Sequence, residues 1–211
     1  MRRYLMEIQK NSRQIPSDKI YTANKSYSDI LYGYLQHISL LEEDLMYRYI
    51  PKADIKYTAI AADLNLSRQT VSKKFNNLVE QGLLSYDAEK KWYILNNLEA
   101  ELATLLPDDT VRVLCNTLQE RCLSILAYLL KTYIQHGKDE CEVSLDIIKG
   151  YVGLNVANRG TNNEIVRDIF IVLEKLGLIE YRIENKRDAA TGGYKTVYVL
   201  EKVDNCVQLL K

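Results

Sequence analysis

Residues 64–84 read LNLSRQTVSKKFNNLVEQGLL, and this stretch has the pattern of a tight turn followed by a helix. Asn65-Leu66-Ser67 has the composition of a tight turn, and Ser67 is well placed to cap a helix that begins at Arg68. The spacing of Val71, Phe75, Leu78 and Val79 predicts that this helix buries one stripe. Gly82 follows where a left-handed C-terminal cap is needed, so we expect the helix to end there.

The segments on either side extend this pattern. A short helix is expected over 58–64, and a β-hairpin over 83–87 and 92–95 around the polar residues 88–91. A longer amphipathic helix is expected from Ser28 until Pro51 stops it, because apolar residues recur there at three- and four-residue steps. These residues are Ile30, Tyr34, Ile38, Leu41, Leu45 and Tyr49.

The same order of elements returns in the second half. Residues 78–86 (LVEQGLLSY) and 173–181 (LEKLGLIEY) share Leu, Gly, Leu and Tyr at a constant spacing of 95 residues. Around them the sequence predicts a long helix ended by Gly137, a short helix capped by Ser144, a helix over 163–176 and a hairpin of 178–184 with 194–200. The helix over 163–176 is expected to bury Ile165, Ile169, Val172, Leu173 and Leu176. This recurrence indicates an internal duplication.

The chain therefore divides into four parts. We expect a basic N-terminal arm over 1–27, a first domain over 28–98, a linker with a short helix over 99–116, and a second domain over 117–211. The expected fold class is mainly α with small β-hairpins (α+β).

The opening stretch resembles the helix-turn-helix core of winged-helix DNA-binding proteins. The likeness covers roughly residues 28–98 and 117–203, with an enlarged turn and a longer wing in the second half. In addition, Ile15-Pro16 followed by residues 27–32 (YSDILY) is similar to the start of plasmid replication initiators of the winged-helix type. The resemblance implies two winged-helix repeats in tandem, a double-stranded DNA partner, and replication initiation or its control on a plasmid or phage-like element.

The helix that begins at Arg68 carries the chemistry of base recognition. Its outward residues include Arg, which can bond guanine, and Gln and Asn, which can bond adenine. From Ser67 to Val79 there are three basic residues and no acidic one, a local excess in a chain whose 28 Lys and Arg balance 28 Asp and Glu. The candidate DNA-binding residues of this half are Arg68, Gln69, Thr70, Ser72, Lys73, Lys74, Asn76, Lys90 and Lys91.

The second half gives a weaker signal for DNA, because Glu164 and Asp168 stand at the start of the corresponding helix. Its basic residues lie in the preceding loop and in the wing, which also contains Arg182, and wings commonly contact the phosphate backbone. We expect the same of the basic arm. The candidate residues of this half are Arg159, Asn163, Arg167, Lys186, Arg187 and Lys195.

Two other functions stay open. A transcriptional repressor would use the same helix, and no effector-pocket signature separates it from an initiator. Winged helices also serve as protein–protein modules, as in chromosome-segregation adaptors of about this length that resemble paired winged helices. Tyrosine-rich apolar surface on the long first helices is compatible with a homodimer, while an intramolecular two-fold arrangement would make a monomer sufficient.

Composition and motifs argue against several classes of protein. The longest apolar stretch, Leu123–Leu130, is too short for a membrane span, and the first residues form no apolar signal region, so we expect a cytosolic protein. Motifs for phosphate-binding loops, dinucleotide binding, zinc proteases and serine hydrolases are missing, so we expect no enzyme and no cofactor. No C-x-x-C pair indicates a metal site, and Cys115 and Cys122 are expected to be small buried hydrophobes.

Overall fold

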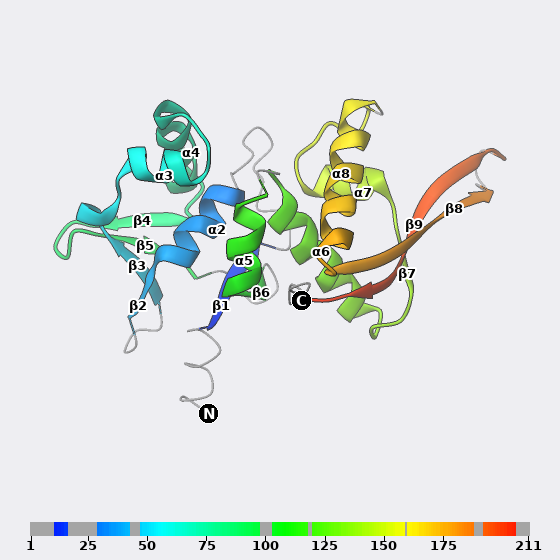
Figure 1. Cartoon of the computed structure of the whole chain (residues 1–211), viewed down its shortest axis with the longest axis horizontal. Coiled ribbons are helices and arrows are strands. Elements are labelled where there is room, and N and C mark those ends of the chain that lie inside the picture. The colour runs from blue at the N-terminus through cyan, green and yellow to red at the C-terminus, as the bar shows by residue number, and fades with distance from the viewer. Residues whose placement is uncertain are drawn as a thin grey trace.

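The computed structural model describes residues 11–16, 29–42, 47–97, 103–117, 120–158, 160–187 and 192–205. Helices and small antiparallel sheets alternate along these residues, so the fold is mixed α and β. Two groups of elements lie at opposite ends of the long axis, with further helices and a two-stranded sheet between them (Figure 1).

The first unit contains residues 64–84. Its elements are α2 (Asp29–Ile38), β2 (Leu40–Glu42), β3 (Tyr47–Pro51), a 3-10 turn (Lys52–Asp54), α3 (Tyr57–Asp63), α4 (Arg68–Glu80), β4 (Leu84–Asp87) and β5 (Trp92–Leu95). The strands form an antiparallel sheet in the order β2-β3-β5-β4. The predicted short helix, the helix from Arg68 and the hairpin are confirmed. Val71, Phe75 and Leu78 are buried as predicted, whereas Val79 lies on the flank of α4 and is 40 % exposed.

The predicted helix over 28–51 is wrong beyond Ile38. Ser39 follows the last residue of α2, and its hydroxyl donates to a carbonyl of the last turn at 2.6 Å. The chain then continues into β2 and β3, and along β3 burial alternates from residue to residue, which is the period of a strand. Tyrosine and isoleucine are common in strands, and here they also recur at helical spacing. Their spacing alone therefore could not show where the helix ends and the strands begin. Leu45 of the predicted stripe lies outside the described residues.

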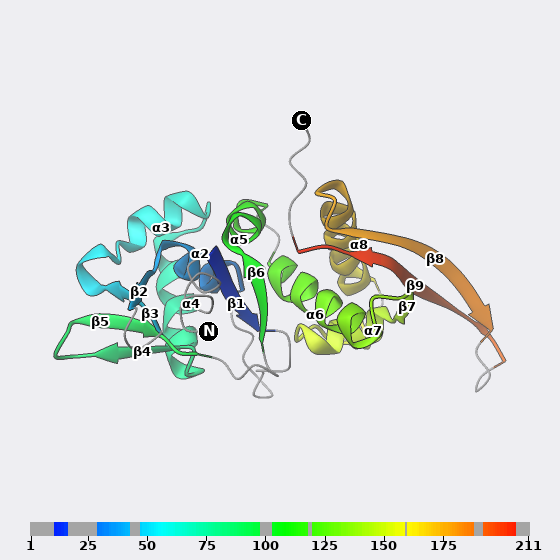
Figure 2. The same cartoon turned by 90° about the horizontal axis from the view of Figure 1, so that it is seen from below.

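The second unit has a similar order of helices and strands. Its elements are α6 (Cys122–Gln135), β7 (Cys141–Val143), α7 (Leu145–Tyr151), α8 (Thr161–Lys175), β8 (Ile179–Arg187) and β9 (Tyr194–Val203). The strand order β7-β9-β8 corresponds to β3-β5-β4 of the first unit. Ser144 caps α7 as predicted, its hydroxyl accepting the backbone N–H of Asp146 at 3.2 Å. The hairpins β4–β5 and β8–β9 extend at opposite ends of the molecule (Figure 2).

The buried stripe of α8 differs from the prediction. Val166, Ile169, Phe170 and Leu173 are fully buried. Three of the five predicted residues, Ile165, Val172 and Leu176, are only partly buried. The observed stripe is the α4 stripe moved by 95 residues, because Val166, Phe170 and Leu173 match Val71, Phe75 and Leu78. The spacing of the repeat therefore locates the buried face of α8 better than its own hydrophobic pattern does.

Both units contain an aromatic cluster between a helix and the hairpin that follows it. Phe75 of α4 meets Tyr93 edge-on with 5.0 Å between ring centroids, and Tyr93 lies 5.0 Å from Tyr86. In the second unit Phe170 of α8 lies 5.1 Å from both Tyr181 and Tyr198. In both units a phenylalanine of the helix therefore packs against tyrosines of the hairpin, and these contacts hold α4 and α8 on their sheets.

The arm and the linker contain two strands that were not predicted. β1 (Ser12–Pro16) pairs antiparallel with β6 (Ala103–Pro107), and the expected short helix follows as α5 (Asp108–Cys115). Ile15 and Leu106 are fully buried, so burial of apolar surface orders these two segments. Arg13 adds an ion pair, with its Nε 2.7 Å from a carboxylate oxygen of Asp108. Apart from residues 11–16, the predicted arm over 1–27 lies outside the described residues.

The two units meet where α2 packs against α5 and α6. Gly33 allows this approach, because a Cβ at Gly33 would lie 2.4 Å from Cδ1 of Leu123 in α6. Asp29, which is 2 % exposed, accepts the backbone N–H of Arg121 at 2.6 Å and that of Ser124 at 3.1 Å. The first helix of one unit thus caps the first helix of the other. Cys115 and Cys122 are buried nearby, as expected.

Candidate nucleic-acid interface

Ser67 and Thr70 fix the start of α4. The Ser67 hydroxyl accepts the backbone N–H of Thr70 at 3.0 Å, and the two side-chain hydroxyls lie 2.8 Å apart. This satisfies one of the free N–H groups of the first turn. Thr70, a predicted DNA contact, thus has its hydroxyl in the cap.

The outer face of α4 is formed by residues opposite the buried stripe. Arg68, Gln69, Lys73 and Asn76 are exposed, and Ser72 is half-buried beside them. Arg68 and Lys73 have no ion-pair partner among the described residues. The face therefore combines two cations with two side-chain amides, and the N-terminal end of the helix dipole adds further positive potential.

Lys74 lies on the flank of α4 that faces the second unit. Its side chain is 24 % exposed and pairs with Glu120, which precedes α6. Lys74, a predicted phosphate contact, links α4 to the joint between the units through this pair. Nothing in the sequence indicated this pair, because its partners are 46 residues apart and lie on elements that only the fold brings together.

The turn between β4 and β5 carries Lys90 and Lys91. Asp87 accepts the backbone N–H groups of Glu89 and Lys90 at 2.9 and 3.0 Å, which fixes the turn. Lys90 Nζ lies 4.7 Å from the ring centroid of Trp92 and donates to the hydroxyl of Tyr47 at 3.2 Å. The hydrogen bond to Tyr47 raises the pKa of Lys90. Lys90 is thus a fixed cation over aromatic rings, and Lys91 is exposed beside it.

The predicted contacts of α8 are less favourable for DNA. Asn163 is half-buried, and exposed Arg167 donates from Nε to the hydroxyl of Tyr198 at 3.3 Å. Glu164 and Asp168 are both exposed on the same helix. Arg159 lies outside the described residues.

The cations of the second hairpin are mostly paired with carboxylates. Arg182 contacts Glu140, Glu184 and Glu201 at 2.7–2.8 Å, and these hydrogen bonds raise its pKa. Lys186 pairs with Glu142 and with Glu184. Arg187 is exposed, and the side chain of Lys195 lies outside what the structure describes. The predicted basic wing is therefore largely neutralised by its own sheet.

This pairing predicts different roles for two lysines. Lys73→Ala is expected to reduce the slope of log K against log salt for DNA by about 0.9, the value for one lost phosphate contact. Lys186→Ala is expected to leave that slope unchanged, because Glu142 and Glu184 already hold the ammonium group. Binding titrations at several salt concentrations measure both slopes. Equal losses in the two variants would contradict the assignment.

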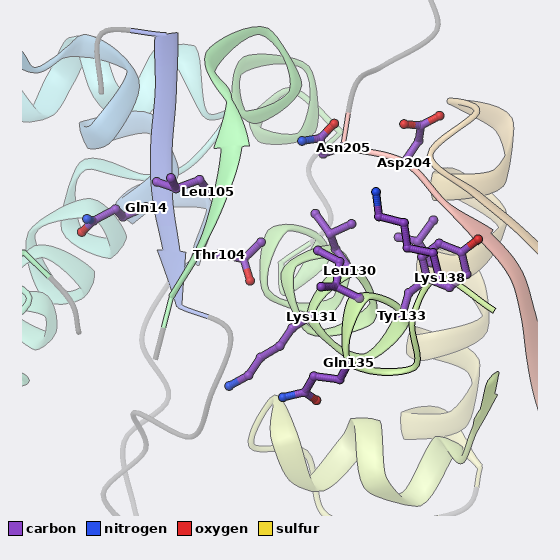
Figure 3. A pocket seen from close by; sticks show the side chains of 12 residues that line it. Gln14, Thr104, Leu105, Leu130, Lys131, Tyr133, Gln135, Lys138, Asp204 and Asn205 are labelled. Atoms are coloured by element: carbon purple, nitrogen blue, oxygen red, sulfur yellow. The ribbon is translucent and has the colours of Figure 1, made fainter. Parts of the chain in front are cut away.

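A cavity of about 610 Å³ lies between the β1–β6 sheet and the C-terminal part of α6 (Figure 3). Its lining includes Leu105, Leu130 and Ile134, with Lys131 and Lys138 among the polar residues. Neither α4 nor α8 contributes a lining residue, so the cavity is separate from the outer face of α4.

Within the described ranges, no three His, Cys, Asp or Glu side chains gather in a way that could hold a metal ion. None of the described helices combines the length and apolar character needed to cross a bilayer.

α4 is thus a capped helix. Its exposed face carries cations and amides, and its opposite face contains a buried aromatic side chain. Comparison of the chain with protein-family models, with curated proteins and with solved structures finds no match.

Proposed function

We propose that this chain binds double-stranded DNA through two winged-helix units in tandem, with α4 in the major groove. The second unit has the order helix, strand, helix, helix and hairpin, and the first unit has the same order with β2 and a 3-10 turn in addition. The strand orders β3-β5-β4 and β7-β9-β8 correspond. In helix-turn-helix proteins the second helix of the motif reads base edges from its N-terminal residues. In the first unit α4 takes that place and α3 precedes it.

The outer face of α4 is the observation that carries this proposal. Arg68, Gln69 and Asn76 are exposed and offer the donor and acceptor pairs that read guanine and adenine in the major groove. Lys73 adds a cation for phosphate, and Lys90 and Lys91 add two more at the adjacent hairpin. The chain as a whole is neutral, so attraction to DNA depends on this local surface.

The biological role that we propose is replication initiation or its control on a plasmid or phage-like element. The tandem units and the likeness of Ile15-Pro16 and residues 27–32 to replication initiators support this role. A repressor would use the same contacts, so the genomic positions of the occupied sites distinguish the two roles: an origin for an initiator, a promoter for a repressor. Either role is one of binding, and we propose no catalytic step and no cofactor.

The test uses a duplex obtained by unbiased selection of bound oligonucleotides. We expect its affinity for the full chain to fall steeply between 50 and 200 mM salt, by about 10³-fold if six phosphates are contacted. Arg68→Ala is expected to reduce discrimination against single base changes by about 1–3 kcal/mol. Arg112→Ala, at an exposed arginine of α5, is the matched control and should leave discrimination unchanged.

Two results would contradict the proposal. An affinity independent of salt would mean that phosphates are not contacted. If the wild type and Arg68→Ala discriminate equally against single base changes, α4 does not read base edges in the major groove. That result would favour the protein-binding adaptor instead.

A further inference from the structure

The cavity beside the C-terminal part of α6 has the size of a ligand site. Its volume of about 610 Å³ lies within the range of roughly 300–1,000 Å³ that is usual for small-molecule pockets. Its lining comes from Gln14 of β1, residues 104–105 of β6, residues between 130 and 138 of α6 and the turn after it, and residues 203–205 at the end of β9 (Figure 3). No sequence motif indicated the site, because these segments are brought together only by the fold.

The walls of the cavity are largely apolar. Leu130, Tyr133 and Val203 are buried, whereas Leu105 of β6 is 43 % exposed and Ile134 of α6 is 52 % exposed. Both exposed side chains line the same cavity, so one apolar molecule can remove both from water. Burial of this surface would favour binding.

The charged side chains of the lining are Lys131, Lys138 and Asp204. The carboxylate of Asp204 already contacts Nζ of Lys202, at 3.4 Å. Glu180, the other contact of Lys202, does not line the cavity. The lining therefore carries two ammonium groups and one carboxylate that a third ammonium group already partners.

The turn after α6 places Lys138 at the rim of the cavity. Its backbone is left-handed, with φ +66°, and its N–H donates to the carbonyl of Tyr133 at 2.9 Å. The N–H of Gly137 donates to the carbonyl of Ile134 at 3.0 Å, so carbonyls at the end of α6 are occupied by this turn. The Lys138 side chain is exposed, reaches toward the end of β9 (Figure 3), and has no ion-pair partner among the described residues.

We propose that this cavity binds a small amphipathic acid. Its apolar chain would cover Leu105 and Ile134, and its carboxylate would accept hydrogen bonds from the ammonium group of Lys138. Ammonium groups only donate and carboxylates only accept, so this pair forms a charge-assisted hydrogen bond that an alcohol forms more weakly. The inference goes beyond the proposed function and does not depend on it, because no residue of α4 lines the cavity.

Octanoate, 1-octanol and octylammonium serve as probes, since they share an eight-carbon chain and differ in the head group. Each is titrated into the full ¹⁵N-labelled chain, and amide chemical shifts locate the site and give the affinity. We expect octanoate to shift the amides of Leu105, Ile134 and Val203 more than those of the rest of the chain. Octanoate should bind about fivefold more tightly than octanol and at least about tenfold more tightly than octylammonium.

Two pairs of variants separate the head group from the chain. Lys138→Gln should weaken octanoate about fivefold and octanol less than about twofold, while Lys175→Gln, at an exposed lysine of α8, should change neither. Ile134→Ser should weaken both probes about fivefold because it removes apolar contact. Its matched control is Ile147→Ser, at an exposed isoleucine of α7 that does not line the cavity, and both affinities should be kept.

Three results would overturn the inference. Octanoate shifts that are no larger at the cavity than elsewhere would exclude the site. Equal affinities for the three probes would exclude recognition of a carboxylate, and equal losses in Lys138→Gln and Lys175→Gln would show general attraction to lysines. None of these results bears on the proposed function, which depends on the DNA titrations with Arg68→Ala.

Discussion

Gly33→Ala is expected to lower the free energy of unfolding by about 1–3 kcal/mol, the usual cost of overpacking a tight core. The added Cβ would lie 2.4 Å from Leu123 Cδ1, 3.2 Å from Cys115 Sγ and 3.3 Å from Val111 Cγ1. All three neighbours are fully or almost fully buried, so none of them can move aside into solvent. Urea unfolding followed by circular dichroism measures the loss.

Gly150→Ala is the matched control for this variant. Gly150 is also a helical glycine, but a Cβ there would meet only Val156 Cγ2, at an ordinary contact distance of 3.6 Å. Without a clash, replacing glycine inside a helix stabilises by about 0.5–1 kcal/mol. The two substitutions are therefore expected to act in opposite directions. A stabilised Gly33→Ala protein would show that α2 does not cross α5 and α6 closely, and that the joint is looser than the structure indicates.

The fold could be predicted from the sequence where a local pattern agrees with tertiary contacts. The cap at Ser67, the stripe of α4 and the glycine after it are such features, and the 95-residue spacing transfers them to α8. The strands β1, β6 and β7 were missed because their partners are distant in sequence, and β2 and β3 were missed because they fall within the predicted long helix. β1, for example, pairs with residues 91 positions away at Gln14 and Leu105. Short strands next to helices leave too few residues for their period to be distinguished from that of a helix.

The candidate interface could also be predicted only in part from the sequence. The outward face of α4 followed from its inward stripe, because a helix has a fixed period. The pairing of Lys74 with Glu120, and of Lys186 with Glu142, could not be predicted, since each pair joins elements that meet only in the folded chain. A count of basic residues in a segment measures charge, but the availability of that charge for phosphate depends on these long-range partners.

Asp29 is expected to make the stability of the joint depend on pH. Burial, and then the nearby charge of Glu120, raise the pKa of Asp29 to about 7 from its ordinary value of 3.8. The backbone N–H groups of Arg121 and Ser124 and the charge of Arg121 act in the opposite direction. The folded protein therefore holds a proton that the unfolded chain releases between about pH 4 and pH 7. For a raised acid pKa, this contribution to stability is largest below the unfolded pKa and is lost as pH rises toward the folded pKa.

The neutral variant Asp29→Asn isolates this effect. Asparagine keeps one acceptor oxygen for the N–H groups of Arg121 and Ser124 but cannot ionise, so it loses one cap hydrogen bond at every pH. The free energy of unfolding of the wild type minus that of Asp29→Asn should then fall as pH rises from 5 to 7, by at most about 1.4 kcal/mol per pH unit. Urea unfolding at several pH values measures this difference.

Asp109→Asn provides the matched control, since the side chain of Asp109 is 86 % exposed on α5. Its difference from the wild type should stay constant over the same pH range. A constant difference for Asp29→Asn as well would mean that Asp29 is ionised in the folded protein throughout. A falling difference would have a functional consequence, because Glu120 lies beside Asp29 and also holds Lys74 of α4. Ionisation of Asp29 would then place a second negative charge near the contact that positions the proposed recognition helix.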